Sequence, residues 1–208
     1  MLDLDWKNYN NNLLNSLSSI SEKALSNLIS QIEPFMGSKA EIHILGNGGS
    51  AANANHINGD FTKTFASYAK PIKINSFADN SCYLTAVSND IDYSEVFTHL
   101  IPGRINRDDL IIFLSGSGNS INLVKCAKKA KKFDINTFCI TGFNGGELKK
   151  ICNHNIHVPI KDMEISEDIQ LVIFHFIKQY LCKKIIRNGV STKLSPKYEK
   201  RIISDEIA

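Results

Sequence analysis

Two pairs of an imidazole and a carboxylate stand out among the residues of this chain that could carry chemistry. His56 and Asp60 are four residues apart, and Glu167 and His175 are eight residues apart. On an α-helix, each spacing brings the two side chains close to one face. Imidazoles and carboxylates can transfer protons, and both are ligands of zinc. Either pair taken alone is better explained by a solvated helix face or by a helix-internal hydrogen bond.

His175 is the more informative of the two histidines. It interrupts an apolar run that extends from Leu171 to Ile177. A buried imidazole without a polar partner destabilises a fold, so this position predicts either a functional group or a core histidine with a satisfied hydrogen bond. The other histidines, which are interpreted as structural or surface groups, are His43, His99, His154 and His157.

Two loops rich in glycine and serine could bind an anion: GNGGS at residues 46–50 and SGSGNS at residues 115–120. Glycine lets the backbone approach a ligand closely, and the free N–H groups and dipole of a following helix favour a negative charge. With no lysine beside the serines, the pattern suits a phosphate monoester held by neutral donors. The alternative is that both loops are tight turns in which Ser50 and Ser120 cap the helices.

Short apolar segments alternate with helical segments along most of the chain. The predicted strands cover residues 41–46, 70–77, 109–117, 136–142 and 155–160, and the predicted helices cover 50–66, 81–103, 120–132, 146–152 and 164–187, after a helix or helix pair over 6–33. This alternation predicts an α/β three-layer sandwich with a five-stranded parallel, flavodoxin-like sheet and an N-terminal helical extension. Ligands of such folds bind at the carboxyl ends of the strands, where we expect both loops.

Composition and charge exclude several classes of protein. The chain has 208 residues, of which 43% are apolar, and a formal charge of +3 that gives no reason to expect nucleic acid. No run approaches the ~20 apolar residues of a membrane helix, and the first residues hold no apolar signal core, so we expect a cytoplasmic protein without membrane contact. The five cysteines form no CxxC pair, which predicts buried thiols in a reducing compartment. Neither loop matches a nucleotide-binding pattern.

Five segments together resemble the sugar isomerase (SIS) domain family, and within it the phosphoheptose isomerases. They read GNGGSAANANHINGDF, AVSNDIDYSEVF, LSGSGNSINLVKCAKKAKK, CITGFNGGELKKICNHNIHVP and SEDIQLVIFH, and the similarity runs from about residue 10 to residue 187. The resemblance implies a homotetramer with sites built between subunits, one zinc ion per site, and a sugar phosphate as substrate. It also implies conversion of sedoheptulose 7-phosphate to glycero-manno-heptose 7-phosphate, for nucleotide-heptose and surface polysaccharide biosynthesis.

The resemblance also assigns roles to individual residues. Substrate contacts are implied for Asn47, Gly48, Gly49, Ser50, Asp60, Asn89, Asp90, Ser115, Gly116, Ser117, Ser120 and Glu167. The implied zinc ligands are His56, Asp60, Glu167 and His175, with Asp60 and His175 as the catalytic acid–base pair in an order left open.

This chain departs from the family pattern at three positions. The better-known members carry glutamate where this chain has Asp60, glutamine where it has Glu167, and often a further histidine where it has Gln170. The first change shortens a candidate base, and displacements of ~1 Å can be costly to catalysis. We hypothesise that the second change, which adds a carboxylate, compensates and gives a set with strong affinity for a divalent ion.

Two alternatives to this isomerase remain open at this point. The chain could be a non-catalytic SIS module that binds a sugar phosphate or regulates a partner such as the bacterial replication initiator, or it could isomerise a different phosphosugar. A module that only binds has no need of both imidazole–carboxylate pairs, which favours an enzyme. We expect one SIS domain over residues 1–188, followed by a tail of unknown role over 189–208.

Overall fold

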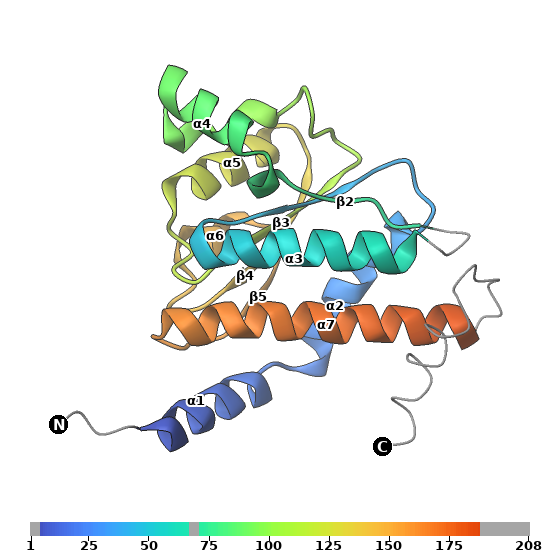
Figure 1. Cartoon of the computed structure of the whole chain (residues 1–208), viewed down its shortest axis with the longest axis vertical. Helices are drawn as coiled ribbons and strands as arrows, with labels where there is room; N and C mark the ends of the chain where they lie inside the picture. The colour runs from blue at the N-terminus through green and yellow to red at the C-terminus, as the bar shows by residue number, and fades with distance from the viewer. Residues whose placement is uncertain (1–4, 67–70, 188–208) are drawn as a thin grey trace.

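The computed structural model describes residues 5–66 and 71–187, and its centre is one parallel sheet (Figure 1). Its strands are β1 (Ile42–Leu45), β2 (Ile74–Ser76), β3 (Leu110–Ser115), β4 (Asn136–Thr141) and β5 (His154–His157). They lie in the order β2-β1-β3-β4-β5, and every neighbouring pair is parallel. This is the flavodoxin-like order of doubly wound folds, so the predicted fold class is confirmed.

Seven α-helices and four short 3₁₀ turns surround the sheet in the described part of the chain. They are α1 (Trp6–Ser18), α2 (Glu22–Ile32), η1 (Glu33–Phe35), α3 (Gly48–Phe65), η2 (Phe77–Asp79), α4 (Ser81–Asp90), η3 (Tyr93–Glu95), η4 (Thr98–Leu100), α5 (Ile121–Lys132), α6 (Gly146–Ile151) and α7 (Met163–Arg187). The helical segment predicted over 81–103 is broken after Asp90. Asp92 is extended there, and its carboxylate accepts from the Ser94 N–H at 2.7 Å, which starts η3.

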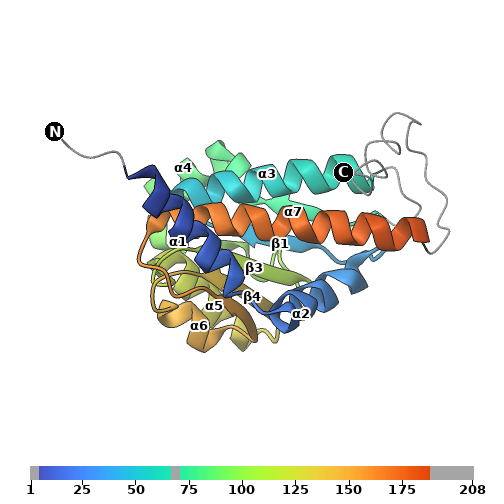
Figure 2. The ribbon, with the colours of Figure 1, turned by 90° about the horizontal axis from the view of Figure 1, so that it is seen from below.

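The sheet is covered on both faces, as the continuous burial of β1 and β3 requires. One face of β3 packs through Ile112 against α2, α3 and α7, and the other packs through Phe113 against α4 and α5. Figure 2 shows α1 on the outer side of α7, where the Tyr9 hydroxyl donates to Asp168 at 2.7 Å. The result is a three-layer sandwich with a helical N-terminal extension, as predicted.

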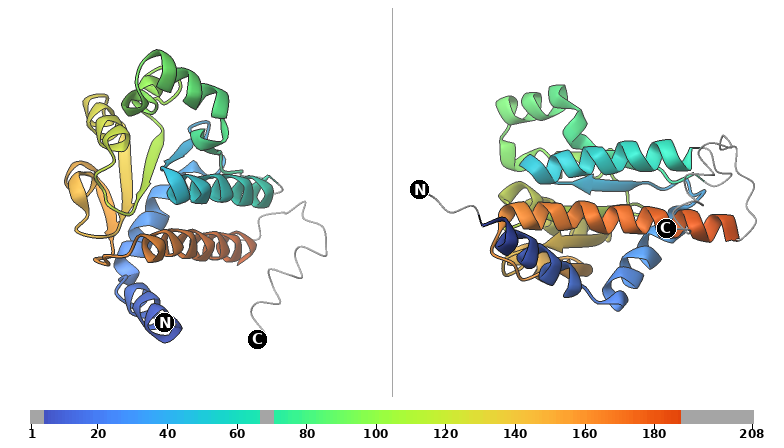
Figure 3. Two further views of the ribbon diagram at one scale, coloured as in Figure 1. Left: turned by 60° about the vertical axis from the view of Figure 1, so that its left-hand side comes forward. Right: turned by 60° about the horizontal axis from the view of Figure 1, so that its bottom comes forward.

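The two glycine-rich loops lie at the same edge of the sheet. They follow β1 and β3, which are adjacent strands that pair Leu45 with Phe113 near their carboxyl ends. The helices after these strands, α3 and α5, depart to opposite faces (Figure 3). Ligands of doubly wound sheets bind where the helices diverge in this way, so the expected position of both loops is confirmed.

Three further expectations concern the cysteines, the membrane and the tail. Cys126, Cys139, Cys152 and Cys182 are buried, but the prediction of a buried thiol is wrong for Cys82, because α4 presents it to solvent. None of the helices in the described ranges carries an apolar stretch long enough to span a bilayer. The tail expected over 189–208 lies outside the described residues.

Candidate active site

A pocket of ≈ 200 Å³ opens at the sheet edge between the two loops. Its lining consists of Asn47, Gly48, Ser50, Leu114, Ser115, Gly116, Ser117, Ser120, Met163 and Glu167. Most of these residues belong to the GNGGS and SGSGNS segments, and the last two come from α7. The structure therefore brings together eight of the residues for which the sequence predicted substrate contacts.

The serine loop offers hydroxyl donors to this pocket. The Ser115 hydroxyl oxygen accepts from the Gly118 N–H at 3.1 Å, and the Ser117 hydroxyl oxygen accepts from the Asn119 N–H at 3.2 Å. A hydroxyl that accepts a backbone N–H keeps its own hydrogen, which it can donate to a phosphate oxygen. Gly118 has φ +69°, a conformation that favours glycine, and its carbonyl accepts from the Leu148 N–H at 3.0 Å, which braces the loop on α6.

The helix-cap alternative for these loops is not what the structure displays. Ser50 lies inside the first turn of α3, whose N-cap is Asn47, and Ser120 is the N-cap of α5. Within the described residues, neither N-cap side chain accepts a capping hydrogen bond from its own helix. The hydroxyl of Ser120 is therefore not used as a helix cap, and Ser120 lines the pocket at the N-terminus of α5, where the helix dipole favours an anion.

Glu167 interacts with the glycine loop. Its carboxylate accepts from the Ser50 N–H at 3.1 Å, and a β-carbon at Gly49 would overlap with it. An internal carboxylate thus already lies at the N-terminus of α3, where the helix dipole stabilises a negative charge. This arrangement leaves the serine loop as the better place for a phosphate.

The amide of Asn47 is held by two neighbours. Asn47 Nδ2 donates to Asn122 Oδ1 at 2.9 Å, and Asn122 Nδ2 donates back to Asn47 Oδ1 at 2.8 Å. The Tyr93 hydroxyl donates to the same Asn47 oxygen at 2.8 Å. One amide hydrogen of Asn47 remains for a ligand, and the orientation of that amide is set by Asn122.

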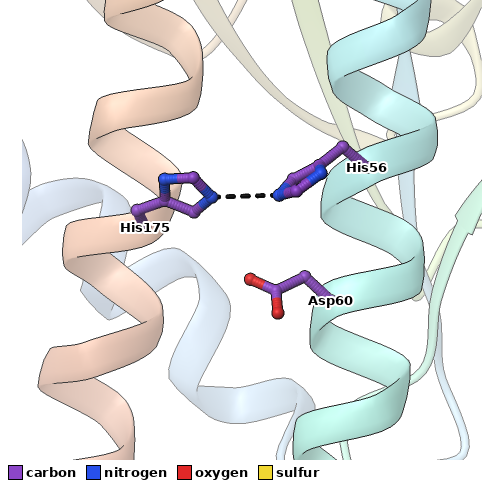
Figure 4. A group of neighbouring side chains, drawn as sticks. All are labelled: His56, Asp60 and His175. Carbon is purple, nitrogen blue, oxygen red and sulfur yellow. Dashed lines mark hydrogen bonds between the residues drawn. The ribbon is translucent and has the colours of Figure 1, made fainter.

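The two imidazole–carboxylate helices, α3 and α7, lie side by side and run in the same direction (Figure 1). His56 Nε2 and His175 Nε2 are 3.0 Å apart, within hydrogen-bond distance. Asp60 follows one turn later on α3, and Figure 4 shows its carboxylate directed toward α7. One ligand atom from each of these three residues lies within 4.8 Å of the others, which brings residues from remote parts of the sequence into one cluster.

Lys178 forms an ion pair with the carboxylate of this cluster. Its ammonium lies 2.6 Å from Asp60 Oδ2, and both side chains are about four-fifths covered. The pKa of His175 is lowered below its ordinary value. Burial is the largest cause, His56 and Lys178 lower the pKa further, and Asp60 opposes the shift. The imidazole of His175 therefore lies beside the carboxylate of Asp60, which pairs with the ammonium of Lys178.

The structure places Glu167 at the pocket but outside the three-residue cluster, and it leaves Asn89 and Asp90 apart from both. Glu167 contacts the glycine loop and is not in the group formed by His56, Asp60 and His175. Asn89 and Asp90 are exposed at the end of α4, where the Asn89 amide donates to the Asp90 carboxylate at 2.8 Å, and neither lines the pocket. The roles of these three residues stay predictions.

Sequence reasoning did not single out Asn122, Tyr93 or Lys178. Two of them carried a readable signal: Asn122 lies two residues after Ser120, in the first helical turn behind the serine loop, and Lys178 lies three residues after His175. Residues three apart share a helix face, so a lysine there falls next to whatever His175 contacts. Tyr93 carries no comparable signal.

Comparison with known proteins shows the family of this chain. The profile of the SIS domain matches residues 5–142. The chain belongs to the SIS domain family.

The relatives of this SIS-domain protein include phosphoheptose isomerases. The enzyme of Mycobacterium bovis (strain BCG / Pasteur 1173P2) is 32% identical over 142 residues, which are 68% of this chain and 72% of the relative. That of Helicobacter pylori (strain P12) is 30% identical over 164 residues, 79% of this chain and 83% of the relative. The structure of a phosphoheptose isomerase from Francisella tularensis superposes with a TM-score of 0.76 at 20% identity, covering 88% of this chain and all of that one, which shows the shared fold.

Proposed function

We propose that this SIS-domain protein is an aldose–ketose isomerase that converts sedoheptulose 7-phosphate to glycero-manno-heptose 7-phosphate. The observation that carries the proposal is the meeting of His56, Asp60 and His175 between two helices that both begin at an anion-binding edge. His56 lies six residues beyond Ser50 on α3, a rise of about 9 Å. The relatives' activity supports the same reaction.

In this proposal the serine loop holds the phosphate and the cluster receives the other end of the sugar. The reaction moves a proton between C1 and C2 through an enediol, so it needs a base at the carbon and a group that exchanges protons with the two oxygens. Asp60 and His175 form that pair, because one offers a carboxylate and the other an imidazole whose pKa is lowered by burial, and both belong to the same cluster. Binding energy from the distant phosphate positions the reacting carbons.

The cluster also fits a zinc ion by its donor set. Two imidazole nitrogens and a carboxylate oxygen are ordinary zinc ligands, and their mutual approach within 4.8 Å suits a shared ion. His56, Asp60 and His175 would hold it, whereas the carboxylate of Glu167, which the sequence also predicted as a ligand, contacts the Ser50 N–H. When bound, zinc would polarise the carbonyl and hydroxyl oxygens of the substrate.

The remaining parts of the proposal concern the setting of the enzyme. We propose one SIS domain over residues 1–188, assembled as a homotetramer in the cytoplasm, with the sites near subunit boundaries. The exposed positions of His56, Asn89 and Asp90 support this assembly, because a neighbouring subunit could bring such side chains to a site. The product would feed nucleotide-heptose and surface polysaccharide biosynthesis.

The decisive experiment measures isomerisation of sedoheptulose 7-phosphate by the wild type and by Asp60→Asn and His175→Gln. Loss of a general acid or base typically costs 10²–10⁴ in rate, so we expect kcat to fall at least about 100-fold in each variant. Matched controls are Asp134→Asn and His99→Gln, which change exposed residues outside the cluster and the pocket. Near wild-type turnover in both cluster variants would refute the assignment.

A panel of pentose, hexose and heptose phosphates separates the proposed substrate from its competitors. We expect the highest kcat/KM with the seven-carbon ketose phosphate. A clear preference for another phosphosugar would redirect the proposal to that sugar, and binding without turnover of any sugar would favour the non-catalytic alternative.

A further inference from the structure

Lys178 is a fully charged cation in contact with the cluster of His56, Asp60 and His175. It lies on α7, three residues after His175, so both side chains lie on the same helix face. Its ammonium donates to Asp60 Oδ2 at 2.6 Å, which leaves the second carboxylate oxygen, Oδ1, for another partner. The contact joins α3 to α7 at the same level as the two imidazoles.

The burial of this ion pair separates it from ordinary surface pairs. The side chains of Lys178 and Asp60 are 20% and 21% exposed, whereas those of Lys150 and Glu147 are 72% and 48% exposed. Solvent and salt screen a covered pair much less than an exposed one. The ammonium therefore exerts a strong, persistent field on every group that approaches Asp60.

The carboxylate of the cluster already has a cationic partner. The two imidazoles share a hydrogen bond between their Nε2 atoms, 3.0 Å apart, and Asp60 supplies one negative charge. Lys178 supplies one positive charge at that carboxylate. A divalent cation that joins this cluster must bind within a few ångströms of an ammonium or displace it from Asp60, and it must break the contact between the imidazoles. Each of these events opposes binding.

We propose that Lys178 is a built-in counter-ion of this site, which positions the Asp60 carboxylate and holds the affinity of the cluster for divalent cations well below that of the same three ligands alone. The inference rests on the proposed site, but it concerns affinity and not turnover. It reverses the expectation that a second carboxylate in the ligand set gives strong metal binding, because the nearest charge to Asp60 is an ammonium and Glu167 contacts the Ser50 N–H.

The test is a zinc titration of the full chain, with binding measured by competition against a fluorescent chelator. We expect Lys178→Met, which keeps most of the aliphatic stem and removes the charge, to lower the Kd for zinc at least tenfold. Lys178→Arg keeps the charge and should stay within about threefold of the wild type. Lys184→Met is the matched control, because Lys184 lies on the same helix and pairs with Glu33 outside the cluster.

Two further measurements control for misfolding of Lys178→Met and for zinc that binds outside the cluster. Lys178→Gln removes the charge but can still donate a hydrogen bond to Asp60, so it tests the charge if Lys178→Met does not fold. The second control adds His56→Ala to either variant, which removes one ligand of the cluster. Zinc that still binds tightly to this double variant is bound elsewhere, for example at the exposed Cys82, and its contribution is subtracted.

The outcomes of the titration and of the turnover assay test the role of Lys178 and the proposed function separately. An unchanged or higher Kd in both neutral Lys178 variants overturns the proposal, as does an equal gain in Lys184→Met or in Lys178→Arg. Turnover of sedoheptulose 7-phosphate is measured separately. If the protein has no isomerase activity but the Kd changes as expected, the proposed function fails while the role of Lys178 stands.

Discussion

Asn47 and Asn122 hydrogen-bond to each other twice through their side-chain amides, at 2.9 and 2.8 Å. Asn47 lies in the glycine loop after β1, and Asn122 lies on α5, behind the serine loop after β3. The pair therefore ties the two loops together across the point where α3 and α5 diverge. Asn122 is 1% exposed, and its amide is satisfied by Asn47 together with the Leu123 N–H, which donates to Asn122 Oδ1 at 2.9 Å.

The first prediction concerns this pair. Asn122→Ala removes both hydrogen bonds between the two amides, which should lower the free energy of unfolding by about 1–3 kcal/mol. Because Asn122 only positions Asn47, we expect KM for the sugar phosphate to rise more than kcat falls. Urea unfolding and steady-state kinetics measure the two effects.

Tyr93→Phe is the matched comparison. It removes one exposed hydroxyl from the same Asn47 oxygen and leaves the amide pair intact, so both effects should be smaller. If Asn122→Ala leaves KM unchanged, Asn47 does not contact the substrate as proposed.

The second prediction concerns the serine loop. Ser117→Ala and Ser120→Ala each remove one hydroxyl donor from the pocket that is proposed to bind phosphate. Hydrogen bonds to charged groups contribute roughly 1.5–3 kcal/mol, so calorimetric affinity for sedoheptulose 7-phosphate should fall at least about tenfold in each. Ser19→Ala, which removes a hydroxyl bonded to the Ser16 carbonyl in α1, serves as the control. Unchanged affinity in both loop variants would exclude this loop as the phosphate site.

The third prediction concerns pH and His43. This side chain is fully buried on β1, and its Nε2 lies 3.2 Å from Asp109 Oδ2. Burial lowers the pKa of His43 below its ordinary value of 6.5, although the hydrogen bond to Asp109 opposes the shift. The unfolded chain therefore binds a proton near pH 6.5 and the folded chain only at lower pH. It follows that stability is complete above about pH 6.5 and falls as the pH drops through the lowered pKa.

The measurement is the free energy of unfolding between pH 7.5 and 5 for the wild type and His43→Gln. The wild type should lose up to about 1.4 kcal/mol per pH unit from this group, and the variant should lose less. His99→Gln, which replaces an exposed histidine, controls for removal of an imidazole as such. Identical pH slopes in the wild type and His43→Gln would contradict the assignment.

The fourth prediction separates the exposed cysteine from the buried ones. Burial raises the pKa of Cys126, and a hydrogen bond with Cys152 together with burial raises that of Cys139, so neither thiol forms the reactive thiolate readily. Cys82 is exposed on α4. Iodoacetamide should add one label per folded chain, at Cys82, as read by intact mass and peptide mapping. Cys82→Ser should add none on that timescale, and a label on Cys126 or Cys139 of folded protein would contradict the burial.

Much of the architecture could be predicted from the residues in order along the chain. The apolar run at residues 110–114 predicts a strand buried on both faces, and the glycines and serines that follow it predict a loop at a helix N-terminus. These are local properties of the chain, because backbone propensity and hydrophobic period act over a few residues. The same reasoning placed both loops at one edge, since parallel strands share their direction.

Other features depend on long-range packing. The sequence offered Glu167 and His175 as one pair on a common face, but the structure directs them to different partners: Glu167 to the Ser50 N–H and His175 to His56. Eight residues of helix span about 12 Å, so a helix packed in parallel contacts the two positions through different turns. Periodicity along one helix does not state which turn of a second helix lies opposite.

The sequence by itself therefore determined which features the site could use. They are loops suited to an anion at one edge of the sheet, two helices that leave this edge, and imidazoles and carboxylates on those helices. Only the tertiary structure decided which of these groups meet, because the distance between α3 and α7 and their relative register arise from the packing of both helices on the sheet. That packing also introduced Lys178 beside Asp60, a contact between residues 118 positions apart in the chain. The charge of the site is consequently a property of the folded protein and not of any one segment.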